Sequence, residues 1–438
     1  MGIKNNQETK DLLELVDKQA LYKEIKNNKL SDSETQKFVE AIFENYFLDN
    51  DNINFLVNNG INFFNFEENE LCFCLSGIKY SECCFANLSD KIDEQYIPFL
   101  KAILNKKDYD KYLSFSNKTF QNAYKDFAKL EKCNYSNCIS KAVENRLYNF
   151  DFEKNMYVST NNTNPFNNNY KMGDNFFNKV DNNNFKFFGF CTKHYNEINK
   201  IVINKESSDK DILLSNFSII LYKLFIARIQ LFCLREEYRN YFNSIKDENI
   251  KPLFIYNLKR ISNHVSSLVD TYNFIKKNIN QELKNYKILK FNLPKTDIFT
   301  ISDLIYPQIC PEDFKLVNSI NNIFITENSA FLKMWVNKDS TLITIIFNND
   351  NKILNNFFNQ YKKIIHAKSK YEAAFISNCA LILADNILFD KIWFDKLENN
   401  NKALFSALNK FRFEHPNMGQ EYLKMKFFAG FNKGNNFF

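Results

Sequence analysis

Two long stretches in the middle of the chain carry apolar residues at the spacing of an α-helix. The first covers residues 207–242, with Ser207 or Ser208 as its N-cap, and its apolar positions are numerous enough to be buried on most sides. The second covers residues 254–283, with apolar side chains every three or four positions. Together they predict a helical hairpin over residues 207–284.

The periodicity changes after residue 285. Short runs rich in β-branched and aromatic residues predict strands at 287–293, 323–326, 331–336 and 341–347. A turn at 337–340 joins the last two as a hairpin. Helical spacing returns at 351–365, 370–386 and 396–411, and we interpret 384–389 as the end of the second of these helices. The chain is therefore predicted to be of the α+β class, with an antiparallel sheet covered by helices on one side.

The N-terminal half is predicted to be mostly helical. Ser31 and Glu34 form a capping box in front of an apolar stripe, and residues 92–131 again show helical spacing. Residues 158–185 are rich in asparagine and poorly periodic, which is typical of an insertion.

Charge and hydropathy say more about where the protein is located than about what it does. The 438 residues carry a net charge of +6, which permits contact with nucleic acid but does not require it. The apolar region 212–234 contains Lys223 and Arg228, whose charges are costly in lipid, so it is predicted to be a core helix and not a membrane span. The N-terminus has no apolar signal core. We expect a cytoplasmic protein, in which clustered cysteines indicate metal binding.

Four of the ten cysteines lie in one short loop. Cys72 and Cys74 are separated by one residue, and Cys83 and Cys84 follow after eight more. Four thiolates complete the tetrahedral shell of Zn²⁺ and leave no position for water, so the predicted site is structural. Oxidation of the vicinal pair is the alternative chemistry for these thiols.

This loop resembles the SEC-C motif, a zinc-binding module found at the C-terminus of the preprotein translocase ATPase and in many otherwise unrelated bacterial proteins. The resemblance implies that the four cysteines bind zinc, and it covers this loop alone. It rests on Cys72, Cys74, Ser76, Gly77, Lys79, Tyr80, Cys83 and Cys84. The loop departs from the usual pattern at Phe73, Leu75 and Ile78.

A second metal site is predicted further along the chain. Cys133 and Cys138 have the spacing of one metal knuckle, and Cys191 and His194 have the spacing of another. Three thiolates and one imidazole form an ordinary structural zinc site. The alternative is that the cysteines are core residues and that His194 lies on the surface.

The two pairs loosely resemble the treble-clef knuckles of HNH-type nucleases. Such a nuclease needs a general-base histidine after the second knuckle cysteine, and residues 139–146 contain none. A basic and aromatic stretch between the pairs could instead stack on bases and contact phosphates, although phenylalanines beside a metal knuckle more often belong to the core. That stretch consists of Lys179, Phe185, Lys186, Phe187, Phe188 and Lys193.

We therefore expect an intracellular zinc protein whose structural metal sites present a surface to a nucleic-acid or protein partner. The alternative is a nuclease-type effector of a bacterial phage-defence system. No catalytic motif and no motif for a small-molecule cofactor is evident. The predicted domains are a helical lead-in (1–70), a zinc loop (71–89), a helical region with a split zinc finger (90–206), the hairpin (207–284) and an α+β domain (285–438).

Overall fold

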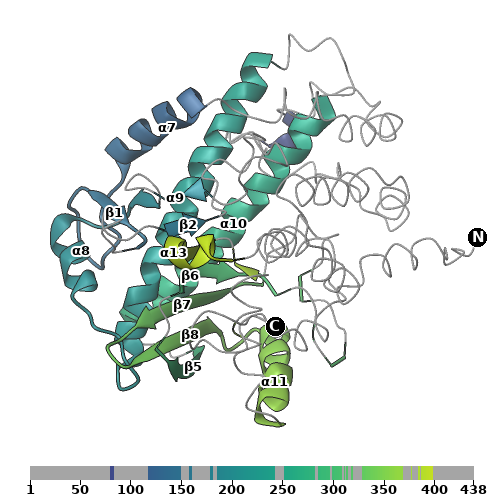
Figure 1. Ribbon diagram of the computed structural model, residues 1–438. Coiled ribbons are helices and arrows are strands. Elements are labelled where there is room, and N and C mark those ends of the chain that lie inside the picture. The colour runs from purple at the N-terminus through teal and green to yellow at the C-terminus, as the bar shows by residue number, and fades with distance from the viewer. Residues whose placement is uncertain are drawn as a thin grey trace, which may run out of the picture.

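The computed structural model in Figure 1 describes most of the C-terminal half and the finger, by which we mean the region that carries Cys133, Cys138, Cys191 and His194. The described residues are 79–82, 117–148, 157–159, 178–180, 185–241, 251–281, 285–295, 298–307, 328–367 and 386–397, with isolated positions between 310 and 384. The predictions for residues 1–70, for the strand at 323–326 and for the helix at 396–411 lie outside this set, as does most of the helix predicted at 370–386.

The predicted helical hairpin is present. Helix α9 spans Asp209–Tyr241 and helix α10 spans Lys251–Gln281, and they lie side by side in Figure 1. Ser208 is the N-cap of α9, because its Oγ accepts a hydrogen bond from the backbone N–H of Asp211 at 3.2 Å. Phe217 of α9 stacks on Tyr272 of α10 with ring centroids 5.7 Å apart.

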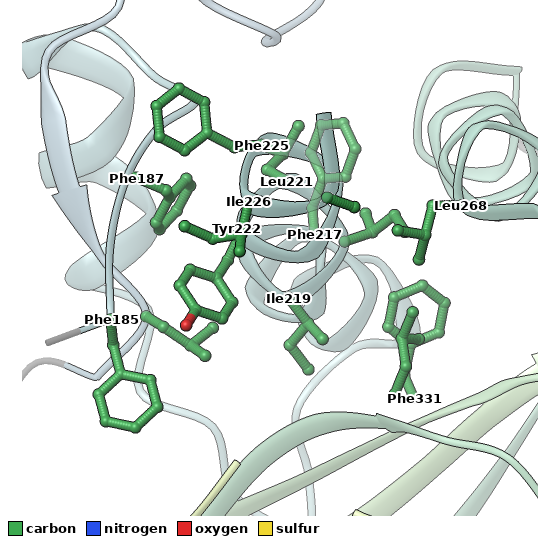
Figure 2. Packing of buried hydrophobic residues seen from close by; sticks show 14 of the residues in the cluster. Phe185, Phe187, Phe217, Ile219, Leu221, Tyr222, Phe225, Ile226, Leu268 and Phe331 are labelled. Carbon is green, nitrogen blue, oxygen red and sulfur yellow. The ribbon is translucent and has the colours of Figure 1, made fainter. Parts of the chain in front are cut away.

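Helix α9 is the centre of the larger hydrophobic core. Its side chains meet phenylalanines of the finger on one side, Leu268 of α10 on another and Phe331 of the sheet below (Figure 2). A helix that is apolar all round suits this central position. Within the described residues, 209–234 is the one segment long and apolar enough to cross a membrane, but 72% of its most apolar window is buried inside the protein. This agrees with the predicted core helix.

In the described part of the chain the main sheet has seven strands, and every neighbouring pair in it is antiparallel. Its order is β3-β2-β9-β6-β7-β8-β5. The strands are β2 (Tyr157–Ser159), β3 (Asn178–Lys179), β5 (Tyr286–Pro294), β6 (Phe299–Ile305), β7 (Ala330–Val336), β8 (Ser340–Asn348) and β9 (Ile387–Asp390). The predicted hairpin is β7–β8, and its turn is closed by the N–H of Asn337 donating to the carbonyl of Ser340 at 2.8 Å.

Helices cover both faces of the sheet, so the prediction of helices on one side is wrong. Along β8, Leu342 and Ile346 belong to the core around α9, whereas Ile343 and Ile345 belong to a second core. This second core is closed by α11 (Lys352–Ala367), which was predicted at 351–365, and by the short α13 (Lys391–Asp395). Because β8 is buried on both faces, its sequence is a nearly continuous apolar run.

Several strands differ from the sequence prediction. Strands β2 and β3 lie near the two ends of residues 158–185, which were predicted to be a poorly periodic insertion. Residues 384–389 do not end a helix, because Ile387–Asp390 forms β9 between β2 and β6. Strand β6 was not predicted, since Ser302 and Asp303 interrupt its apolar pattern. Both polar side chains are buried. Pairing with distant strands has therefore outweighed the local polar pattern, which does not favour a strand.

A buried polar network joins α9, β6, β9 and the finger. Asp303 is fully buried and pairs with Nζ of Lys223 in α9 at 2.7 Å. Its other oxygen accepts from the N–H of Asn386 at 2.8 Å, and the carbonyl of Asn386 accepts from the hydroxyl of Tyr148 at 2.6 Å. Burial and the charge of Asp303 raise the pKa of Tyr148 well above its ordinary value, so it stays a neutral donor.

Candidate metal centre

Cys133, Cys138, Cys191 and His194 converge in the structure. The four ligand atoms all lie within 4.8 Å of one another, although the two pairs are more than fifty residues apart in sequence. Nδ1 of His194 is 3.4 Å from Sγ of Cys133 and 3.3 Å from Sγ of Cys191. Sγ of Cys138 is 3.9 Å from Sγ of Cys191. The predicted pairing of the two knuckles is therefore present in the fold.

These separations fit a tetrahedral zinc ion. Bonds of about 2.3 Å to sulfur and about 2.0 Å to nitrogen give tetrahedral edges of roughly 3.8 Å between sulfurs and roughly 3.5 Å between sulfur and nitrogen. The three observed separations lie within a few tenths of an ångström of these edges. Three thiolates and one imidazole would fill the shell, so a bound zinc ion would have no open position for water or substrate.

The first knuckle is a tight turn closed by backbone hydrogen bonds. The N–H of Cys133 donates to Ser140 at 2.9 Å, and the N–H of Cys138 donates to Tyr135 at 3.1 Å. Asn137 has a φ of 59°, a left-handed conformation that asparagine tolerates better than most residues. The reversal at Asn137 turns the chain back so that Cys138 faces Cys133.

The second knuckle lies between a strand pair and a helix. Strand β1 (Glu144–Arg146) pairs antiparallel with β4 (Lys186–Phe188), and helix α8 (Thr192–Asn199) follows directly. Cys191 occupies the N-cap of α8, and His194 lies within its first turn. One helical turn therefore brings both ligands to the same end of the helix. The finger thus runs from the first knuckle through a strand pair to a helix that carries the second pair of ligands.

Asn145 fixes the loop that leads to Cys191, a role that had no signal in the sequence. This fully buried side chain accepts from the N–H of Phe190 at 2.7 Å and from the N–H of Gly189 at 3.2 Å. Its amide donates back to the carbonyl of Phe190 at 3.3 Å. The three bonds hold the backbone just before the ligand, as outer residues commonly do around zinc.

The ligands differ in their local electrostatics. Burial raises the pKa of the Cys133 thiol to about 11, whereas a backbone hydrogen bond from Ser140 lowers the pKa of Cys138. Zinc would have to displace a proton from Cys133. The ring of His194 stacks on Tyr135 with centroids 4.0 Å apart and planes 9° apart, which fixes the imidazole with Nδ1 toward the thiols.

Two phenylalanines of the basic and aromatic stretch, Phe185 and Phe187, cannot stack on bases. Phe185 and Phe187 are fully buried, and the centroids of their rings lie 6.0 and 6.1 Å from that of Tyr222 in α9 (Figure 2). Lys186 pairs with Glu144 at 2.8 Å, across the β1–β4 ribbon. The stacking proposed for this stretch is therefore wrong for these phenylalanines, which attach the finger to the core.

A cleft of about 190 Å³ lies beside the first knuckle, between the knuckle and the helical hairpin. Two lysines, Lys210 of α9 and Lys276 of α10, lie on its wall, and none of the described residues on this wall is acidic. The described lining consists of Asn134, Tyr135, Ser136, Lys210, Leu214, Phe217, Lys276, Ile279 and Asn280. The cleft therefore combines positive charge with amide, hydroxyl and aromatic groups.

Hydrogen bonds connect this cleft to the metal site. Nζ of Lys276 donates to the hydroxyl of Tyr272 at 2.6 Å, and that hydroxyl donates to Oδ1 of Asn134 at 2.9 Å. Asn134 in turn donates from its side chain and from its backbone N–H to the carbonyl of Gly189, at 3.0 and 2.8 Å. Hydrogen bonds therefore connect the wall of the cleft to the first knuckle, through Asn134, and to the segment before Cys191, through Gly189.

The first cysteine cluster lies outside the described residues. Cys72, Cys74, Cys83 and Cys84 are not among them. Between the two pairs the structure describes residues 79–82, where Tyr80–Glu82 forms a short 3₁₀ turn and the N–H of Glu82 donates to the carbonyl of Lys79 at 3.1 Å.

Comparison with known proteins bears on this first cluster. The family model of the SEC-C motif matches residues 69–86, which include all four of its cysteines. Neither the comparison with curated proteins nor the comparison with solved structures finds a match. The chain thus contains a SEC-C motif and, separately, a cluster of three cysteines and one histidine with the geometry of a metal site.

Proposed function

We propose that the chain is a zinc-stabilised interaction protein whose finger presents a basic cleft to nucleic acid. The proposal that the finger binds zinc rests on the convergence of four ligand atoms within 4.8 Å of one another. A filled coordination shell makes the metal structural, so its contribution is to hold the two knuckles together. Zinc also fits the SEC-C motif at residues 69–86.

The cleft beside the first knuckle supports the nucleic-acid part. Phosphate groups are bound by lysine charges and by amide and hydroxyl donors, and bases stack on aromatic rings. Lys276 and Lys210 supply the charge, and Tyr135 supplies an aromatic ring at the same wall. Because one face of Tyr135 lies on the ligand His194, metal binding would order this wall.

A protein partner is the second candidate, and exposed apolar side chains on the finger favour it. Ile139 is 92% exposed directly after Cys138, and Leu130 is 76% exposed at the end of α7 (Asn117–Leu130). The segments that carry them are joined by the N–H of Ala142 donating to Glu131 at 3.0 Å. Isolated apolar residues are common on surfaces, so this evidence is weaker than the cleft.

No observation favours the nuclease alternative over these two. Residues 139–190 contain no histidine to act as a general base between the knuckles. His264 is not at the metal centre, since its ring lies against Tyr306 at 6.2 Å between centroids. Incubation of zinc-loaded protein with plasmid and RNA in the presence of Mg²⁺ or Mn²⁺ tests this alternative, and cleavage would establish it.

Elemental analysis tests the metal part. We expect two zinc ions per wild-type chain, one for each set of four ligands, and one in a Cys138→Ser/His194→Asn variant. Cys233→Ser is the matched control, because Cys233 is a buried cysteine of α9 and not a ligand, and it should retain both ions. Equal zinc content in the finger variant and the control would contradict the proposal.

Binding of labelled single-stranded RNA and DNA tests the nucleic-acid part. We expect binding that weakens with salt, and a Lys276→Gln change should reduce the salt slope by about one because one phosphate contact is lost. Lys362→Gln is the control, since Lys362 is an exposed residue of α11 on the opposite face of the sheet. Binding that is unaffected by Lys276→Gln, or absent for every oligonucleotide, would exclude this cleft as the site.

A further inference from the structure

Strand β5 forms one edge of the sheet. It pairs with β8 on one side, and in the described part of the chain no strand pairs with its other side. Figure 1 shows β5 below β8, at the outer limit of the sheet. This edge is accessible, because Leu293 is the only buried residue among residues 286–293, whereas every residue from 341 to 347 of β8 is buried.

The register shows which backbone groups of β5 face the open edge. In an antiparallel pair, hydrogen-bonded residue pairs alternate with pairs whose N–H and C=O groups point away from each other. The N–H of Asn349 donates to the carbonyl of Asn285 at 2.8 Å, which makes this a hydrogen-bonded pair. In steps of two from Asn285, the odd-numbered residues of β5 bond to β8. Ile288, Lys290 and Asn292 therefore direct their backbone groups outward.

The hairpin on the other side of β8 gives the same result independently. The N–H of Asn337 donates to the carbonyl of Ser340, so the even-numbered residues of β8 bond to β7 and its odd-numbered residues bond to β5. Odd-numbered residues of β8 lie opposite odd-numbered residues of β5. Ile288, Lys290 and Asn292 thus make no ladder bond to β8.

Two lysines flank these outward groups, one on each face of the sheet. Lys290 is exposed on the face of α9, and its Nζ is 3.6 Å from Oδ1 of Asp209. Lys287 lies on the face of α11 and donates to Oδ1 of Asn355 at 2.7 Å, and no carboxylate in the described part of the chain pairs with it. Strand β5 itself contains no acidic residue. The edge therefore combines backbone donors and acceptors with positive charge.

We propose that the open edge of β5 is a docking site for an extended acidic segment of a protein partner, which would continue the sheet by one strand. Backbone hydrogen bonds to Ile288 and Lys290 would supply affinity, and carboxylates beside Lys287 and Lys290 would supply selectivity. A second copy of the chain fits less well, because pairing β5 with itself would bring lysines together along one seam with no acidic residue to offset them. Lysines on edge strands oppose such self-pairing.

The register also predicts the spacing of the acidic residues in the partner. Facing residues of paired strands place their side chains on the same face of the sheet. The partner residues opposite Lys287 and Lys290 are three positions apart, whichever direction the partner strand runs. The two residues between them lie beside Ile288 and Leu289, which pack at the rims of the two cores. Two carboxylates that enclose two β-branched residues therefore fit this edge.

Fluorescence anisotropy of a labelled peptide, Thr-Glu-Val-Val-Glu-Thr, tests the site on zinc-loaded full-length protein. The peptide reads the same in both directions, so it does not presuppose the direction of the added strand. We expect saturable binding that weakens with salt and becomes about two- to fivefold weaker in each of Lys287→Gln and Lys290→Gln. Lys125→Gln is the matched control, because Lys125 is an exposed lysine of α7, and it should bind like wild type. N-methylation of both valines should abolish binding, since it removes their backbone donors.

Amide hydrogen exchange at single-residue resolution tests the geometry of the edge. In the free protein the N–H groups of Ile288 and Lys290 should exchange faster than those of Leu289 and Phe291, which bond to β8, and excess peptide should slow them. Slow exchange of Ile288 and Lys290 in the free protein would overturn the proposal. So would a peptide that does not bind, or one that binds equally to wild type and to Lys287→Gln/Lys290→Gln. A dimer in sedimentation equilibrium whose formation protects the same amides would assign the edge to a second copy instead.

Discussion

Removing one charge from the buried ion pair between Asp303 and Lys223 should lower the free energy of unfolding more than any other single change of charge in the helical hairpin. Asp303 is fully buried, and the side chain of Lys223 is 12% exposed. Changing Asp303 to asparagine keeps the shape but leaves the ammonium group without a counter-charge. It also turns an amide N–H₂ toward Nζ of Lys223 or toward the N–H of Asn386, both of which are donors.

The expected loss in the free energy of unfolding follows from the burial of this ion pair. Breaking one partner of a buried ion pair costs about 3–5 kcal/mol, because the remaining charge stays buried. Lys223→Met should cost a similar amount, since it leaves the carboxylate of Asp303 unpaired. The double variant Asp303→Asn/Lys223→Met removes both charges, so its loss should be smaller than the sum of the single losses by about 2–3 kcal/mol.

Urea denaturation followed by tryptophan fluorescence measures these losses. The two tryptophans report unfolding on both faces of the sheet, because Trp335 of β7 packs against the core around α9 and Trp393 of α13 belongs to the second core. Lys129→Met is the control, because its ion pair with Asp126 is exposed and should contribute less than about 1 kcal/mol. A loss in Asp303→Asn no larger than in this control, or losses that simply add in the double variant, would refute the reasoning.

Three further predictions concern the finger and its attachment. Gly189→Ala should destabilise the fold by about 1–3 kcal/mol in urea denaturation, because a Cβ there would lie 2.7 Å from the buried ring of Phe187; unchanged stability would contradict this packing. Tyr148→Phe should cost about 1–3 kcal/mol and leave the zinc content unchanged, since it removes the hydroxyl that accepts from the N–H of Ser302 at 3.0 Å. Zinc affinity at the finger should rise with pH, because the pKa of about 11 at Cys133 means that binding releases a proton. Competition with a chelator across the neutral range measures this dependence, and an affinity that is independent of pH would contradict it.

The convergence of Cys133, Cys138, Cys191 and His194 was predictable because their residue types and spacings are local features. The knuckle Cys133–Cys138 and the pair Cys191–His194 are each confined to a few residues, and zinc ligands must lie close together whatever the rest of the fold does. The side chains that position the ligands were not predictable. Asn145 acts through three bonds to a loop more than forty residues away, and an asparagine in an asparagine-rich chain carries no such signal.

The basic and aromatic stretch shows how burial decides between two interpretations of the same residues. In the sequence, phenylalanines alternate with lysines between the two ligand pairs. In the structure, Phe185 and Phe187 face the core, and Lys186 pairs with Glu144. The positive charge at the cleft beside the finger comes instead from Lys210 and Lys276, which the hairpin brings to the knuckle from distant positions in the chain.

Short-range periodicity and spacing were enough to predict helices α9 and α10, the β7–β8 hairpin, helix α11 and the two pairs of finger ligands. The tertiary structure alone decided which strands pair across long separations, and therefore which polar residues become buried. Strand β9 joins β2 to β6 because hydrogen bonds between distant segments outweigh local preference. The pairing of β6 with β7 and of β7 with β8 aligns Ser302, Lys333 and Thr344 beneath α9, since cross-strand register determines which side chains become neighbours.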